Sequence, residues 1–156
     1  MVYQTFSSLI NGIENELENA LNEGGVRDKA KNSLSRSVQE QVYNRKSSGD
    51  YRTGALKASS DTTLIKSDGG LLLSVFNNPE KMNGFIDSYG NEAHTSWVTN
   101  NTQHENIVLW TVEGNEGSPL YSYRGRNFIS YAYDDITNNM VKWIRQSLQA
   151  RGVKTL

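Results

Sequence analysis

The sequence predicts an α+β domain in which N-terminal helices and a C-terminal helix pack on a small, mostly antiparallel sheet. Three observations support this fold class. Helical spacing of apolar residues marks both 6–43 and 134–150, and β-branched or apolar runs separated by turn residues lie between them. Helices grouped at the ends of a chain, rather than alternating with strands, are typical of an α+β fold. We expect the chain, 1–156, to form a single domain with a sizeable core.

The N-terminal part has the pattern of two amphipathic helices. In the first, apolar residues recur at spacings of three and four, at Phe6, Ile10, Ile13, Leu17 and Ala20. After Gly24-Gly25, a second series repeats every four residues to about Tyr43, at Val26, Ala30, Leu34, Val38 and Val42. We expect most of these apolar residues to lie in the core. The segment 44–50 has loop composition and should end the helical part.

Strand-like segments follow the helices. The runs 60–66 and 71–76 are β-branched and apolar, and Asp68-Gly69-Gly70 between them has the chemistry of a hairpin turn. The segment 77–106 is expected to be a long loop or insertion that contains a short element, and loops of this length are usually functional or mobile. Residues 107–112, IVLWTV, fit either a strand or a short buried helix. Residues 121–126 are expected to form a strand that leads to the last helix.

The last helix is indicated by apolar residues at Ile136, Met140, Trp143 or Ile144, and Leu148. We place Asp134 and Asp135 near its N-terminus, where carboxylates interact favourably with the helix dipole. Arg151-Gly152 has the composition of a helix end.

The charge balance and the lack of cysteine exclude several classes of protein. Sixteen basic and seventeen acidic residues give a net charge of −1, so the strong overall field of a dedicated binder of nucleic acids or anionic membranes is missing. Without cysteine, the chain forms no disulfide and no thiolate metal site. The segment 1–21 has neither the basic start of a signal peptide nor the uninterrupted apolar run of a membrane span. We therefore expect a protein that is made and used in a cytosol and does not contact a membrane.

Metal and phosphate sites are not indicated. His94, His104 and Glu105 offer nitrogen and oxygen ligands, but their spacing matches no helical ligand pair, so we expect ordinary loop histidines. The pair Gly24-Gly25 precedes a helix, but it lacks both the spacing of a phosphate-binding loop and a preceding strand. We therefore expect no metal and no cofactor.

A catalytic site is not indicated either. Glu92 or Glu113 could pair with Asp134 or Asp135, as in glycosidases, but charge at a helix N-terminus explains the two aspartates better. The sequence has no G-x-S-x-G motif and no thiol nucleophile. We expect the protein not to be an enzyme, with a hydrolase that uses an unrecognised carboxylate site as one alternative.

Basic residues with aromatic neighbours gather in two short stretches. They are Arg45, Lys46, Arg52 and Lys57 in the first stretch, and Arg124 and Arg126 in the second. Such patches can hold a nucleic-acid backbone and stack bases, yet subunit interfaces use the same residue types. A small nucleic-acid-binding accessory protein is therefore a second alternative.

Several short motifs, taken in order, resemble a known family. They are Val42-Tyr43 at the end of the second helix, YRTGAL at 51–56, VFNN at 75–78, EGN at 113–115 and RNFISYA at 126–132. This series resembles the head-tail joining, or tail-completion, proteins of long-tailed bacteriophages, and it covers nearly the whole chain. The chain departs from the family pattern at Asn115, where threonine is usual, and at Asn127, where proline is usual.

The resemblance implies a virion protein that performs no chemistry, of the kind called a tail-completion protein, tail terminator or head-tail connector. Its copies would form a homo-oligomeric ring, expected to be a hexamer, at the neck between head and tail. Its other partners would be the neighbouring neck and tail proteins, and DNA would pass through the lumen without sequence-specific binding. The protein would be assembled in the cytoplasm of the bacterial host and end at the head-tail junction of the virion.

Under this resemblance, two regions supply candidate interface residues. Arg52 and Thr53 belong to the helix-to-sheet corner, where a guanidinium could either bridge to a neighbouring subunit or tie down its own turn. The aromatic residues of the long loop could be docking anchors on a partner or a satellite hydrophobic cluster. The full set of expected interface residues is Arg52, Thr53, Leu56, Phe85, Tyr89, Trp97, Arg124 and Arg126.

Overall fold

The computed structural model describes residues 5–23, 25–44, 54–67, 70–82, 108, 112–115 and 123–155. Its elements, in chain order, are helices α1 (Phe6–Asn22) and α2 (Val26–Val38), the π-helical turn η1 (Gln39–Tyr43), helix α3 (Ala55–Ala58), strands β1 (Ser60–Ser67) and β2 (Gly70–Asn77), the 3-10 turn η2 (Pro79–Met82), strands β3 (Gly114–Asn115) and β4 (Tyr123–Arg124), and helix α6 (Phe128–Ala150). Helices packed beside small antiparallel sheets confirm the predicted α+β fold.

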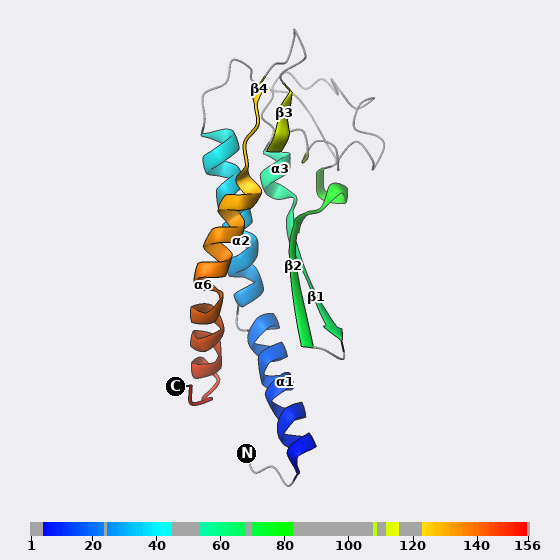
Figure 1. Ribbon diagram of the computed structural model, residues 1–156, viewed down its shortest axis with the longest axis vertical. Coiled ribbons are helices and arrows are strands. Elements are labelled where there is room, and N and C mark those ends of the chain that lie inside the picture. The colour runs from blue at the N-terminus through cyan, green and yellow to red at the C-terminus, as the bar shows by residue number, and fades with distance from the viewer. Residues whose placement is uncertain are drawn as a thin grey trace.

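The elements are arranged along one long axis (Figure 1). Helices α2 and α6 run side by side, and the β1–β2 hairpin packs against α2. Helix α1 contacts α6 and α2, and its first turns extend past both the hairpin tip and the C-terminal end of α6 (Figure 1). Among the described residues, no helix has the length and apolar character needed to cross a bilayer.

The two N-terminal helices form where the apolar periodicity predicts them. Helix α1 begins with a capping box, because the Thr5 hydroxyl accepts from the backbone N–H of Ser8 and the Ser8 hydroxyl accepts from that of Thr5, both at 3.1 Å. Gly25 has a φ of 72°, a left-handed conformation that suits glycine, and it separates α1 from α2. The second helix reaches Tyr43 as predicted, but its last turn widens to a π-helix in which Asn44 N–H donates to the Gln39 carbonyl at 2.8 Å.

The predicted hairpin is also confirmed. Strands β1 and β2 are antiparallel, and their register runs from the pair Ser60–Asn77 to the pair Ser67–Gly70. Because side chains alternate between the two faces of a strand, the pair Leu64–Leu73 shares one face and the pair Ile65–Leu72 shares the other. The conformation of Asp68-Gly69 lies outside the described residues.

The start of the last helix differs from the prediction. Helix α6 begins at Phe128, since the side chain of Asn127 accepts from the Ser130 N–H at 3.0 Å and caps the helix. Asp134 and Asp135 therefore lie beyond the first helical turn, and their predicted role as N-terminal dipole charges is wrong. Asp135 instead accepts from Arg36 of α2 at 2.7 Å.

Helix α6 ends where the Arg151-Gly152 composition predicted, and its end is a Schellman motif. Gly152 has a φ of 80° and donates to the Gln149 carbonyl at 2.9 Å. Val153 donates to the Leu148 carbonyl at 3.0 Å, so the last carbonyls of the helix are satisfied.

The core lies where α2, α3 and α6 meet. Its buried members are Leu34, Val38, Leu56, Phe128 and Ala132. The hydroxyl of Ser37 donates to the Phe128 carbonyl at 2.6 Å and satisfies this backbone group, which the first turn of α6 places in the core. In the IVLWTV segment, the described residues Val108 and Val112 are helical, which favours the short-helix interpretation at those positions.

Candidate functional site: exposed apolar surfaces

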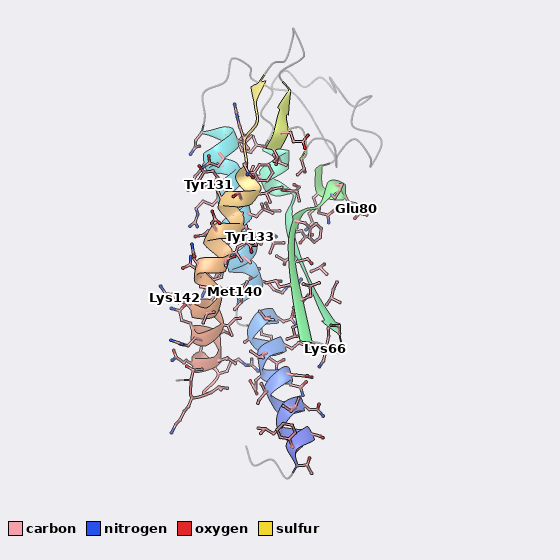
Figure 2. All side chains as sticks on the ribbon, viewed as in Figure 1. Lys66, Glu80, Tyr131, Tyr133, Met140 and Lys142 are labelled. Atoms are coloured by element: carbon pink, nitrogen blue, oxygen red, sulfur yellow. The ribbon has the colours of Figure 1, made fainter. Side chains whose placement is uncertain are left out.

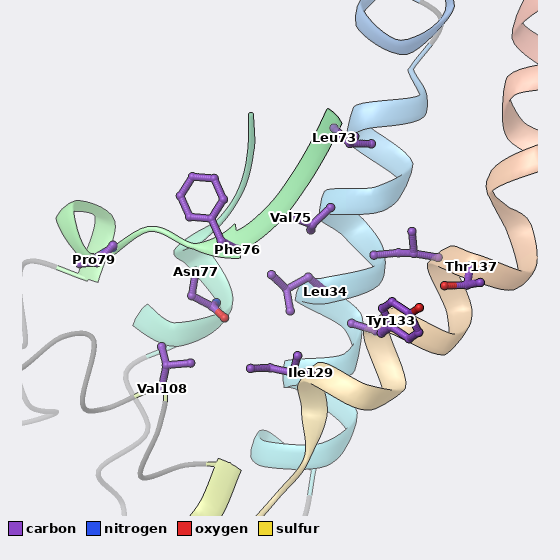
Figure 3. Close-up of a pocket in the computed structure, with 12 residues that line it drawn as sticks. Leu34, Leu73, Val75, Phe76, Asn77, Pro79, Val108, Ile129, Tyr133 and Thr137 are labelled. Atoms are coloured by element: carbon purple, nitrogen blue, oxygen red, sulfur yellow. The ribbon is translucent and has the colours of Figure 1, made fainter. Parts of the chain in front are cut away.

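An apolar groove of about 490 Å³ lies between β2 and α6 (Figure 3). Leu34 of α2 forms its floor, Leu73 and Val75 of β2 form one wall, and Ile129 and Tyr133 of α6 form the other. The groove is open because α6 buries Phe128 and Ala132 against α2, while the neighbouring face of the helix receives no cover from the hairpin. Tyr133 is 67% exposed at this rim.

The polar groups in the groove are few. None of the described residues that line it carries a charge, and its amide, Asn77, is already bonded within the chain. The Nδ2 atom of Asn77 donates to the Leu56 carbonyl at 2.9 Å and to the Ser59 hydroxyl at 3.0 Å. Small-molecule sites need a few polar groups that converge on the ligand. An apolar protein surface therefore fits this groove better than a small polar ligand.

Helix α1 carries a second apolar surface. Phe6, Ile10 and Ile13 recur at the i, i+4, i+7 spacing of one helix face, and they are 77%, 38% and 47% exposed. The same helix buries Ala20 and Leu21 against the rest of the chain. The apolar periodicity therefore continues into turns that no other described element covers. We call Phe6, Ile10 and Ile13 the α1 stripe.

The outer face of the hairpin is a third exposed apolar surface. Ile65 and Leu72 are cross-strand neighbours on the face that points away from α2, and Leu72 is 58% exposed. Tyr131 of helix α6 is exposed as well, and Figure 2 labels it on the other side of the helix from Tyr133, away from the hairpin. Soluble monomers rarely expose large contiguous apolar patches, and such patches commonly mark contact surfaces.

The predicted interface residues are not brought together by the described structure. Leu56 is a core residue, buried beside Val38 and Phe128. The guanidinium of Arg126 donates to the Val42 carbonyl at 2.7 Å, so it joins the segment before α6 to η1 within the chain. Arg124 lies in β4, where its backbone pairs with that of Gly114. The remaining predicted residues lie outside the described part of the chain: Arg52, Thr53, Phe85, Tyr89 and Trp97.

A polar network joins α2 to α6 on the side away from the groove. The carboxylate of Asp135 accepts from the Ser33 hydroxyl and from Arg36, and Asn139 donates to the Asp135 carbonyl at 2.8 Å. Because this carboxylate is used in holding the two helices together, it is a poor candidate for a catalytic acid or base. Glu113, which the sequence offered as a possible catalytic partner of this carboxylate, is exposed, and Glu92 lies outside the described residues.

One carboxylate has a shifted pKa, for a structural reason. Lys81 lies 2.7 Å from Asp61, and this contact, together with hydrogen bonds from Asn78 and the Thr62 N–H, lowers the pKa of Asp61 to about 2. The pair ties η2 to β1. At the other end of the molecule, Glu16 and Glu23 contact Arg151 and raise the pKa of its guanidinium.

No group of three His, Asp or Glu side chains in the described part of the chain is placed to hold a metal ion. His94 and His104 both lie outside that part.

Sequence reasoning did not identify the α1 stripe as a surface, because helical periodicity shows which face is apolar and not what covers it. One feature of the sequence could have indicated that this helix face is not solvated. Thr5–Ile13 contains no charged residue, and its polar positions are Ser, Asn and Thr, whereas a solvated helix face usually carries charges.

Comparison of the chain with protein-family models, with curated protein sequences and with solved structures found no match.

Proposed function

We propose that the chain is a non-enzymatic structural protein of a bacteriophage virion, whose copies form a ring, expected to be a hexamer, at the neck between head and tail. The observation that carries this proposal is the exposure of large apolar side chains on α1, on the outer hairpin face and on α6. An assembly that covers these surfaces removes them from water and gains the free energy of apolar burial. The motif series from Val42-Tyr43 to RNFISYA at 126–132 indicates the class of assembly.

The placement of the surfaces favours a ring over a two-fold dimer. The α1 stripe lies at one end of the molecule, and the groove lies between β2 and α6, further along the long axis (Figure 1). Two different surfaces of one chain that meet between copies make a head-to-tail interface, and such an interface closes into a ring when the rotation per subunit permits.

The remaining features of the proposal follow from the position at the neck. The neighbouring neck and tail proteins are the other partners, and the net charge of −1 suits a lumen through which DNA passes without being held. In this proposal the chain is assembled in the bacterial cytoplasm and remains in the virion.

The described residues give little support to the two alternatives. The nucleic-acid-binding alternative relies on basic residues, yet Arg126 is bonded to the Val42 carbonyl and Lys57 donates to Gln39 at 3.1 Å. The hydrolase alternative relies on paired carboxylates, and Asp135 is used in the network between α2 and α6.

Deleting the gene for this chain from the genome that encodes it tests the proposal. We expect filled heads and complete tails that remain separate in electron micrographs, with joining restored when the gene is supplied from a plasmid. Joined, infectious particles made without the chain would contradict the proposal. Supplying the Asp134→Asn variant, altered at an exposed position on α6, is the matched control and should restore joining.

A further inference from the structure

We propose that the α1 stripe of one copy docks in the groove between β2 and α6 of a second copy. The inference deepens the proposed function by naming the contact between subunits. It rests on that function only for the closure of the ring, because the contact itself could also build another head-to-tail oligomer.

Among the described elements, the α1 stripe cannot fill the groove of its own chain, because α1 is held away from it. The hydroxyl of Ser147 on α6 donates to the Ala20 carbonyl at 3.1 Å, and Arg151 contacts Glu16 at 3.2 Å. On the hairpin side, Lys66 lies 3.3 Å from Glu18. These contacts fix the second half of α1, so its first turns project beyond the molecule (Figure 1).

The stripe and the wall of the groove have the same spacing. Phe6, Ile10 and Ile13 are at i, i+4 and i+7 on α1, and the helical wall of the groove repeats the spacing at Ile129, Tyr133 and Ile136 on α6. At a rise of about 1.5 Å per residue, each series is about 10 Å long. Two helix faces with matching ridges can interdigitate, and the β2 wall then covers the other side of the inserted helix.

The two surfaces also match in charge. Thr5–Ile13 contains no charged residue, and none of the described residues that line the groove is charged. The first charge on the inserted helix is Glu14, one residue past the stripe. Docking therefore removes apolar side chains from water on both copies, and none of the described residues at the contact becomes a buried unpaired charge, which is the costly event at interfaces.

A second copy explains both exposed surfaces with one contact. Each chain offers one stripe and one groove, so every copy in a closed ring uses both. A helix of a neighbouring neck or tail protein would cover the groove and leave the stripe exposed. For this reason we assign the groove to a second copy of the chain.

Cysteine cross-linking tests the contact directly, because the natural chain has no cysteine. Two purified single variants, Ile10→Cys on α1 and Ile129→Cys at the groove, are mixed at concentrations from micromolar to near the solubility limit and oxidised. In the control, Asn15→Cys takes the place of Ile10→Cys. Asn15 is exposed, and because it lies about five residues after Ile10, it is nearly opposite the α1 stripe on the helix. Circular dichroism and thermal unfolding check that the three variants fold.

We expect a covalent dimer of Ile10→Cys with Ile129→Cys, and loss of that product when Asn15→Cys is used. Three outcomes would overturn the docking proposal: equal cross-linking by the control, a dimer formed by Ile10→Cys alone, or no cross-link at any concentration. The second of these shows an α1–α1 contact, and the third shows that the stripe does not meet the groove in the free protein.

Failure of the contact and failure of the proposed function give different results. If the chain is needed for head-tail joining but the cross-link does not form, the docking inference fails and the neck function stands. If the cross-link forms but joining proceeds without the chain, the function fails and the docking stands.

Discussion

Arg126 donates a hydrogen bond to the backbone carbonyl of Val42 at 2.7 Å and thereby joins the start of α6 to the π-helical turn that ends α2. The contact spans 84 positions of the chain and satisfies a carbonyl at a helix C-terminus, where carbonyls lack partners within the helix. An arginine expected from sequence to serve an interface therefore has a role within its own subunit.

Arg126→Ala should lower the free energy of unfolding by about 1.5–3 kcal/mol, the usual range for a hydrogen bond that involves a charged group. Urea unfolding measures this difference. Arg145→Ala, at an exposed position on α6, is the matched control and should change the stability by less than about 0.5 kcal/mol. Unchanged stability in Arg126→Ala, accompanied by loss of oligomers, would assign the arginine to the interface instead.

Substitutions in the α1 stripe should affect self-association, whereas substitutions at the buried end of α1 should affect the stability of the monomer. Phe6→Ser alters an exposed side chain and should change the stability of the monomer by less than about 0.5 kcal/mol, while reducing self-association. Leu21→Ala removes a buried side chain and should cost about 2–4 kcal/mol. Urea unfolding and sedimentation velocity separate the two effects. A large loss of monomer stability in Phe6→Ser would show that the stripe is part of the fold.

The pair Asp61–Lys81 should make stability depend on pH in acid. Because the folded state lowers the pKa of Asp61 from 3.8 to about 2, the carboxylate stabilises the fold above pH 3.8, and this contribution is lost as the pH falls through 2. The contribution should be about 1–2 kcal/mol, since each pKa unit corresponds to about 1.4 kcal/mol and both side chains are partly solvated. Urea midpoints of the natural chain and Asp61→Asn should therefore converge as the pH falls from 6 to 2.

A difference between these two proteins that stays constant over the whole pH range would contradict the account of Asp61. Asp134→Asn, at an exposed position, controls for the general effect of removing one negative charge.

Gly125 should not tolerate a side chain. A Cβ atom at this position would come closer to the carbonyl groups of Val112 and Glu113 than real Cβ atoms come to any neighbour, and backbone atoms cannot rotate away. Gly125→Ala should therefore destabilise the protein by about 1–3 kcal/mol, as overpacking does. Thermal unfolding checks this, and an unchanged midpoint would mean that Gly125 moves easily away from Val112 and Glu113.

The sequence was sufficient to predict the regular elements that have a clear period. Both N-terminal helices, the hairpin strands and the Gly152 helix end could be predicted because each depends on local spacing or on a residue with special backbone freedom. The start of α6 could not, because Phe128–Tyr133 is rich in aromatic and β-branched residues, which favour strands. Its helical state depends on the Asn127 cap and on burial of Phe128 against α2, and the burial is a tertiary effect.

The candidate site was harder to predict than the fold, for a different physical reason. The apolar face of α1 is buried in its second half and exposed in its first half. Only the position of α6 and the hairpin explains why Ala20 is buried and Ile10 is exposed. The predicted anchors Arg52, Phe85 and Trp97 lie outside the described residues and stay predictions.

The central claim is the ring at the neck, and electron microscopy of purified particles from the genome that encodes the chain tests it most directly. We predict a ring of about six copies at the head-tail junction, in which α1 of each copy lies in the β2–α6 groove of the next, consistent with a closed head-to-tail assembly. Particles whose neck contains no density for this chain, with the protein found only free in the lysate, would contradict the claim.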